Sequence, residues 1–74
     1  MASDRADEAG PVIVDARGMR CPWPALRLAR AMRGASDVRL IADDPQAGRE
    51  IAALAAEQGW TVESEGAERW RVRR

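Results

Sequence analysis

Hydrophobic and polar positions along the chain change their spacing several times, and each change marks a different predicted element. The β-branched run at residues 12–15 predicts a short first strand, which ends before Gly18. Apolar residues then recur every three or four positions over residues 25–33, which predicts a helix with Gly34 as its C-terminal cap. Residues 38–42 are mostly apolar and predict a second strand.

The second half of the chain repeats this succession of a helix and strands. Asp44 precedes a proline, so we expect its carboxylate to cap the N-terminus of a second helix, at a gain of about 1 kcal/mol. Helical spacing continues to Gln58, and Gly59 ends it. Polar and apolar residues then alternate on both sides of Gly66, which predicts a β-hairpin.

The predicted elements follow the order βαβαββ. A short β-α-β crossover favours parallel pairing of the first two strands, and the closing hairpin adds antiparallel strands. We therefore predict an α/β (α+β) fold, a two-layer sandwich in which two helices cover one face of a mixed four-stranded sheet. On the solvent side of the hairpin, Glu63 and Glu65 are expected to pair with Arg69 and Arg71, at ~0.2–1 kcal/mol per pair.

Composition limits how this fold is held together. A chain of 74 residues is one small domain, and it has a single cysteine, so no disulfide framework supports it. Hydrophobic residues make up 46%, but many are alanine and there is no Phe or Tyr, so we expect a thin core. Trp60 and Trp70 are expected to pack on the sheet. Residues 1–10 are interpreted as a flexible N-terminal tail and residues 11–74 as the domain.

The charge balance and the hydropathy of the chain disfavour nucleic acids and membranes as partners. Twelve basic residues, all arginine, match 12 acidic ones, so the net charge is zero and direct nucleic-acid binding is not expected. No apolar run approaches membrane-spanning length, and the N-terminus lacks a hydrophobic signal core. We therefore predict a cytoplasmic protein, in which a lone thiol stays reduced. Nothing in the sequence indicates a metal ion or a cofactor.

The candidate chemistry centres on Cys21, in residues 18–24 (GMRCPWP) of a chain without histidine or lysine. We expect Cys21 at the N-terminus of the first helix, where the helix dipole, Arg17 and Arg20 would lower the thiol pKa below its ordinary value of about 8.5. Pro22 and Pro24 would make this segment rigid. The alternative interpretation is a small apolar residue packed at a strand–helix junction.

The absence of a second cysteine narrows the reactions open to Cys21. No thiol in the chain can resolve a covalent group on this sulfur, so an internal redox cycle is impossible. A group carried by Cys21 must come from one molecule and leave to another. This favours a carrier over a stand-alone oxidoreductase or hydrolase, and because a carrier makes transient contacts it suggests a monomer.

Three segments resemble the TusA/SirA sulfur-carrier family: residues 14–24, 41–45 and 49–51, within a similarity that spans residues 12–73. The resemblance implies the βαβαββ fold and a cysteine of a C-P-x-P motif that accepts sulfane sulfur as a persulfide. The implied donor is a cysteine desulfurase or a rhodanese-type protein, and the acceptor is a sulfurtransferase with a reactive cysteine. Carried onto this chain, the persulfide site is Cys21, with Gly18, Arg20, Pro22 and Pro24 as its scaffold.

Four further residues are candidate partner contacts. Parallel pairing of the first two strands places Asp43 and Asp44 near Cys21, where they would dock a basic patch of the acceptor. Arg33 belongs to a stripe of arginines that is either a solvated face or, as the resemblance implies, a contact with an acidic donor. Trp23 either anchors a transient interface beside the thiol or folds back on the helix.

These observations predict a sulfur carrier, most plausibly for tRNA thiolation. Sulfur oxidation and sulfur supply for molybdenum cofactor would use the same chemistry. A non-catalytic regulatory or interaction module, in which the cysteine only packs, is the alternative from a different class.

Overall fold

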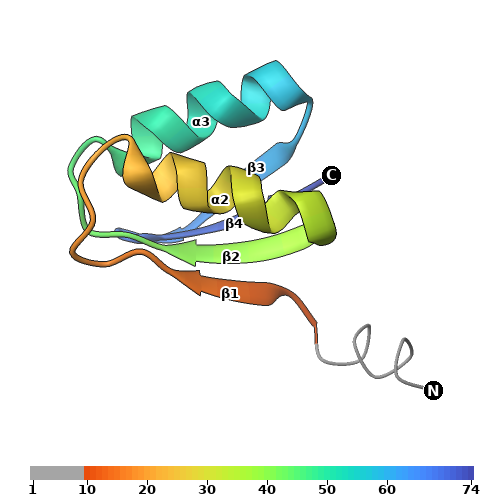
Figure 1. Cartoon of the computed structure of the whole chain (residues 1–74), viewed down its shortest axis with the longest axis horizontal. Coiled ribbons are helices and arrows are strands. Elements are labelled where there is room, and N and C mark those ends of the chain that lie inside the picture. The colour runs from red at the N-terminus through yellow and green to blue at the C-terminus, as the bar shows by residue number, and fades with distance from the viewer. Residues whose placement is uncertain (1–9) are drawn as a thin grey trace.

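The protein folds into two layers in a computed structural model, in which residues 10–74 are described (Figure 1). One layer is a four-stranded sheet and the other consists of two helices that lie on the same face of it. The elements are β1 (Val12–Asp15), α2 (Trp23–Gly34), β2 (Asp37–Ile41), α3 (Ala47–Gln58), β3 (Thr61–Gly66) and β4 (Arg69–Arg73). The predicted βαβαββ sandwich is confirmed. The predicted tail, apart from Gly10, lies outside the described residues.

The sheet has the strand order β1-β2-β4-β3. Strand β1 runs parallel to β2, with Val14 opposite Leu40, whereas β4 pairs antiparallel with both β2 and β3. Because β1 and β2 are parallel, the loops that follow them leave the sheet at the same edge. This edge carries the candidate site.

The core lies between the helices and the sheet, and its inward side chains follow the periods seen in the sequence. Alternate residues of β2 are buried, as are residues of the helices at intervals of three or four. Trp60 and Trp70 pack partly buried against this core, as predicted. The buried cluster comprises Val14, Ala16, Leu28, Met32, Val38, Leu40, Ala42, Ala47, Ile51 and Val72.

Two local predictions about helix ends and strand limits need correction. Gly34 is the last residue of α2, and the capping position is taken by Ala35 in extended backbone. Strand β2 begins one residue earlier than predicted and ends at Ile41. Gly59, in contrast, does end α3 in the left-handed conformation, with φ of 77°.

The charged residues of the hairpin form ion pairs, but not with the partners that we predicted. Glu63 lies opposite Arg71 in the register, but its carboxylate binds Arg73 at 2.8 Å. Arg71 instead donates two hydrogen bonds to Asp37, at 2.6 and 3.0 Å. Strand β4 lies between β2 and β3, so its arginines have acidic residues on both sides.

Neither helix in residues 10–74 has the length and hydropathy that crossing a membrane requires.

Candidate functional site

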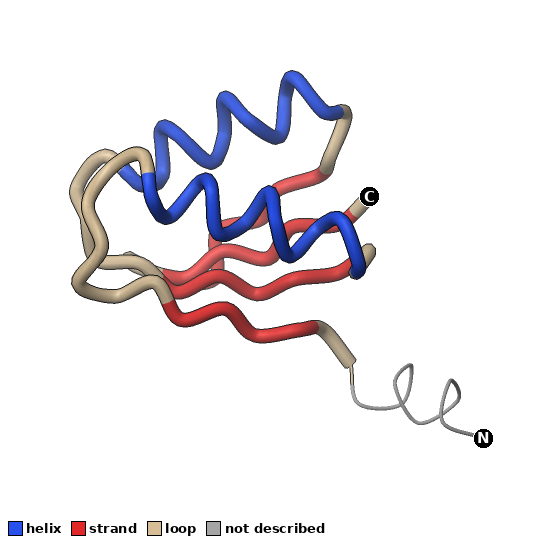
Figure 2. Tube along the Cα trace, in the orientation of Figure 1, coloured by secondary structure: helices blue, strands red, loops and turns tan. Residues whose placement is uncertain are grey.

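Two loops form the candidate site at one end of the molecule. Residues 16–22 connect β1 to α2, residues 42–46 connect β2 to α3, and the two loops lie side by side (Figure 2). At their base, the amide of Ala16 donates a hydrogen bond of 2.7 Å to the carbonyl of Ile41. The parallel pairing of the strands therefore extends directly into the site.

Two aspartates of the second loop bind backbone amides of the first. The carboxylate of Asp43 accepts a hydrogen bond from the Gly18 amide at 2.9 Å, through Oδ1. The carboxylate of Asp44 accepts one from the Cys21 amide at 2.8 Å, through Oδ2. The predicted proximity of these aspartates to Cys21 is confirmed.

Asp44 does not have the capping role that its position before a proline suggested. Helix α3 begins at Ala47 with Gln46 as its N-cap residue, and no side chain caps it. Only the backbone carbonyl of Asp44 serves the helix, by accepting a hydrogen bond from the Ala47 amide at 2.9 Å. Because Pro45 and Gln46 intervene, the carboxylate reaches across to the cysteine loop instead.

The predicted scaffold residues shape the loop around the thiol. Gly18 adopts φ of 83°, in the left-handed region that favours glycine. Pro22 is the N-cap residue of α2 and is exposed, whereas Pro24 lies in the first turn and is buried. Arg20 is exposed, and its carbonyl accepts the Trp23 amide hydrogen bond at 2.8 Å.

The Cys21 thiol is half-buried, and its surroundings do not favour the thiolate. Partial burial raises the pKa of Cys21, and the negative charge of the Glu50 carboxylate raises it further. The negative charge of Asp44 acts in the same direction. The lowered pKa expected from the sequence is therefore wrong.

Of the two arginines expected to lower this pKa, Arg17 is engaged elsewhere and Arg20 is exposed to solvent. Arg17 forms two side-chain hydrogen bonds with Asp15, at 2.7 and 2.9 Å, and holds the pKa of that carboxyl at about 2. The first turn of α2 also offers few amides, because Pro22 and Pro24 have none and the Trp23 amide is bound to a carbonyl. The helix dipole alone does not outweigh the carboxylates.

Trp23 is exposed, which contradicts the alternative in which it folds back on the helix, whereas its role in an interface stays a prediction. Its exposed fraction is 59%, and Leu26, one turn further along α2, is 49% exposed. Both side chains are therefore available to a partner next to the Cys21 loop. Large apolar groups in such a position are typical of transient interfaces.

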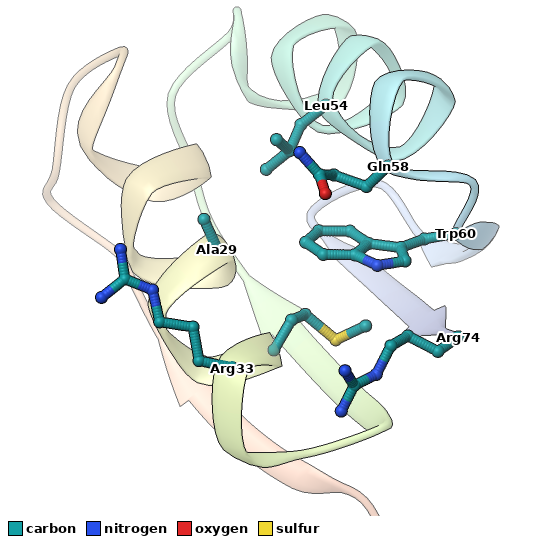
Figure 3. Close-up of a pocket in the computed structure, with 7 residues that line it drawn as sticks. Ala29, Arg33, Leu54, Gln58, Trp60 and Arg74 are labelled. Atoms are coloured by element: carbon teal, nitrogen blue, oxygen red, sulfur yellow. The ribbon is translucent and has the colours of Figure 1, made fainter.

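Arg33 lies at the opposite end of α2 from Cys21, roughly 15 Å from Trp23 along the helix axis. It lines a groove of about 480 Å³ between the C-terminal ends of the two helices, with Trp60 and Arg74 on other sides (Figure 3). The structure thus brings Asp43 and Asp44 to the cysteine loop, which Trp23 directly follows, but not Arg33.

Glu50 is the residue of this site that sequence reasoning missed. It lies in the first turn of α3, where an acidic residue stabilises a helix regardless of any function. The signal that would have identified it is its position: α3 begins at the same sheet edge as Cys21, so residues of its first turn face the cysteine loop.

No three histidine, cysteine, aspartate or glutamate side chains within residues 10–74 are grouped so that they could hold a metal ion.

Comparison with known proteins shows to which family the chain is similar. No curated protein matches the chain. The family model described as sulfurtransferase TusA matches residues 12–73, from the first residue of β1 to the last of β4. The match includes both loops of the site. The chain therefore belongs to the TusA sulfurtransferase family.

Proposed function

We propose that the chain is a sulfur carrier that accepts sulfane sulfur as a persulfide on Cys21. The donor is a cysteine desulfurase or a rhodanese-type protein, and the acceptor is a sulfurtransferase with a reactive cysteine. The observation that carries the proposal is the position of the only thiol. Cys21 is half-buried, between the loops that meet at the sheet edge and next to the exposed Trp23.

The proposed reaction exchanges one sulfur–sulfur bond for another. The Cys21 thiolate attacks the outer sulfur of the donor persulfide, and the donor's S–S bond breaks as the new bond forms. The donor cysteine leaves as a thiolate and takes up a proton from water. In the second step an acceptor thiolate attacks the outer sulfur on Cys21, which leaves as the thiolate. Neither step needs an external oxidant or a cofactor.

The proposed partners differ in charge. Arg33 and Arg74 line the groove between the helix ends, and no acidic residue lines it, which suits an acidic donor surface. Asp43 and Asp44 line a cleft of about 450 Å³ beside the cysteine loop, with Arg20 as its single basic residue, so the lining has an acidic excess that suits a basic acceptor surface. The proposed acceptor contact adjoins the sulfur, whereas the donor contact lies at the far end of α2.

The acceptor pathway we favour is tRNA thiolation. Sulfur oxidation and sulfur supply for molybdenum cofactor would use the same thiol and the same exchange. In the alternative from a different class, a regulatory or interaction module, Cys21 would carry no sulfur.

The test of the carrier function is sulfur loading measured by intact mass. The full chain is incubated with a cysteine desulfurase and cysteine, or with a rhodanese-type donor. We expect a gain of about one sulfur atom, ~32 Da, as a persulfide. The matched control, Cys21→Ser, should gain nothing. Wild-type protein that remains unmodified with both donor types would rule out the carrier function in favour of the interaction module.

The proposed donor contact predicts a charge-specific defect at Arg33. Arg33→Glu should lower the rate of loading at low donor concentration about fivefold, equivalent to ~1 kcal/mol for an exposed ion pair. The control is Arg30→Glu, because Arg30 is exposed on the same helix but does not line the groove. Equal rates for the two variants would show that the groove does not contact the donor.

A further inference from the structure

The groove between the helix ends is lined by two arginines and by apolar side chains. Arg33 reaches it from α2, and Arg74 reaches it from the position directly after β4 (Figure 3). Trp60 and Leu54 supply apolar surface, and no acidic residue among those described lines the groove. Its volume of about 480 Å³ falls within the range of clefts that bind a ligand.

Both guanidinium groups of the groove are available to an anion. Neither Arg33 nor Arg74 has an ion-pair partner within residues 10–74. Arg74 is also held in place, because its Nη2 donates a hydrogen bond to the Ala35 carbonyl at 2.9 Å and its amide donates one to the Ser36 carbonyl at 3.0 Å. The other N–H groups of this guanidinium remain for a carboxylate. The groove therefore favours an occupant with an excess of negative charge.

The first strand begins at the same end of the molecule as this groove (Figure 1). In the register of the sheet, Val38 of β2 lies opposite both Val12 of β1 and Val72 of β4. The start of β1 is therefore two strand spacings, roughly 10 Å, from the end of β4. Nine residues precede Gly10, and nine extended residues span up to about 30 Å. This length is sufficient to reach the groove.

Those nine residues have the charge that the groove favours. Three acidic side chains stand against one basic side chain, Arg5; the acidic residues are Asp4, Asp7 and Glu8. We propose that residues 1–9 occupy the groove of their own chain and compete there with the sulfur donor. The competition rests on the proposed function, in which the donor contacts the same groove. The occupation of the groove rests only on charge, length and position.

The consequence of this competition is selectivity for the donor. Because the segment is tethered to the domain, it is present at the groove at a high effective concentration, and a donor has to displace it. An occupancy of about one half to two thirds lowers the apparent affinity for the donor about two- to threefold. Saturating donor displaces the segment, so the maximal rate of loading is unchanged. A protein that binds the groove only weakly is therefore excluded from it.

The first test is NMR spectroscopy of the full chain, and it needs no donor. The three acidic residues are replaced together, and this neutral variant is Asp4→Asn/Asp7→Asn/Glu8→Gln. The indole N–H signal of Trp60 should shift in the neutral variant, because the segment leaves the groove that Trp60 lines. The matched control is Arg5→Gln, which increases the negative excess of the segment and should move the same signal in the opposite direction.

Three outcomes of this test would overturn the occupation of the groove. An unchanged Trp60 signal in the neutral variant would show that the segment is not in the groove. A shift confined to the indole of Trp23 would place the segment at the other end of α2, beside the cysteine loop. A shift that depends on protein concentration would show that the groove takes residues 1–9 of a second copy.

The second test is the rate of sulfur loading by a cysteine desulfurase. Well below saturation, the neutral variant should load about two- to threefold faster than the wild type, and at saturating donor the two should load equally. High salt should remove the difference, because it screens exposed charges. In an Arg33→Glu background, the three substitutions should no longer accelerate loading, because one cation of the groove is gone.

The loading rates can contradict the competition in two ways. An acceleration that persists in the Arg33→Glu background would reflect general repulsion between acidic surfaces and would refute it. Equal rates at low donor concentration, with the Trp60 shift present, would refute it as well. If neither protein takes up sulfur, the carrier function is wrong, whereas the NMR comparison still decides whether residues 1–9 occupy the groove.

Discussion

Leu28→Ala is expected to destabilise the protein by about 2–5 kcal/mol, the range for removing a leucine from a packed core. Leu28 is completely buried beneath α2, where it packs in the cluster between the helices and the sheet. A chain of this length has a free energy of unfolding of about 4–11 kcal/mol. The substitution therefore removes a large part of the total, and the midpoint of unfolding should fall to a much lower urea concentration.

The effect is large because few side chains make up this core. The chain has no Phe or Tyr, and a small domain buries a smaller share of its surface than a large one. The largest fully buried side chains are Leu28, Met32, Leu40, Ile51, Val38, Val72 and Pro24. When a side chain in such a core is shortened, its neighbours are too few to fill the cavity.

Leu26→Ala is the matched control, because it makes the same change two residues earlier on the same helix. Leu26 is 49% exposed, so we expect a loss below about 1 kcal/mol. Urea unfolding followed by tryptophan fluorescence measures both variants, since Trp60 and Trp70 pack against the core. Equal losses would show that the helix does not use this face for packing.

The fold could be predicted because three signals agree along most of the sequence. These are the spacing of hydrophobic residues, the positions of the glycines and the order of the predicted elements. The β-branched residues of β1, the helical spacing that ends at Gly59 and the alternation of the hairpin each correspond to an observed element. Gly34 misled the prediction because a glycine near a helix end is a good cap only where the chain turns into the left-handed region. Here the chain continues in extended backbone at Ala35.

The site could be predicted in its location but not in its electrostatics. Cys21 was identifiable because the chain has one thiol and no histidine or lysine, and parallel strands placed Asp44 near it. The direction of the pKa shift depends on which charges are paired. Sequence alone does not show that Arg17 binds Asp15, or that the charge of Glu50 acts on the thiol. Both interactions depend on how the side chains are oriented, which hydrophobic periodicity does not specify.

Asp44→Ala should lower the rate of sulfur loading on Cys21 about tenfold. The Asp44 carboxylate accepts the hydrogen bond of the Cys21 amide at 2.8 Å and thereby holds the sulfur in place between the two loops. A hydrogen bond to a charged group contributes about 1.5–3 kcal/mol, and partial exposure places this one near the lower limit. An energy of ~1.4 kcal/mol corresponds to a factor of ten in rate.

Asp44→Asn separates the hydrogen bond from the charge, because its amide oxygen still accepts the Cys21 amide. We expect this variant to load sulfur within about threefold of the wild type, a loss of under ~1 kcal/mol. Both variants lose a charge that raises the pKa of Cys21, so alkylation by a small reagent should be faster in each. If Asp44→Ala loads sulfur more slowly but is alkylated faster, the defect lies in the position of Cys21 and not in the reactivity of its thiol. If Asp44→Asn loads as slowly as Asp44→Ala, the carboxylate acts through its charge on a partner, and the positioning role is refuted.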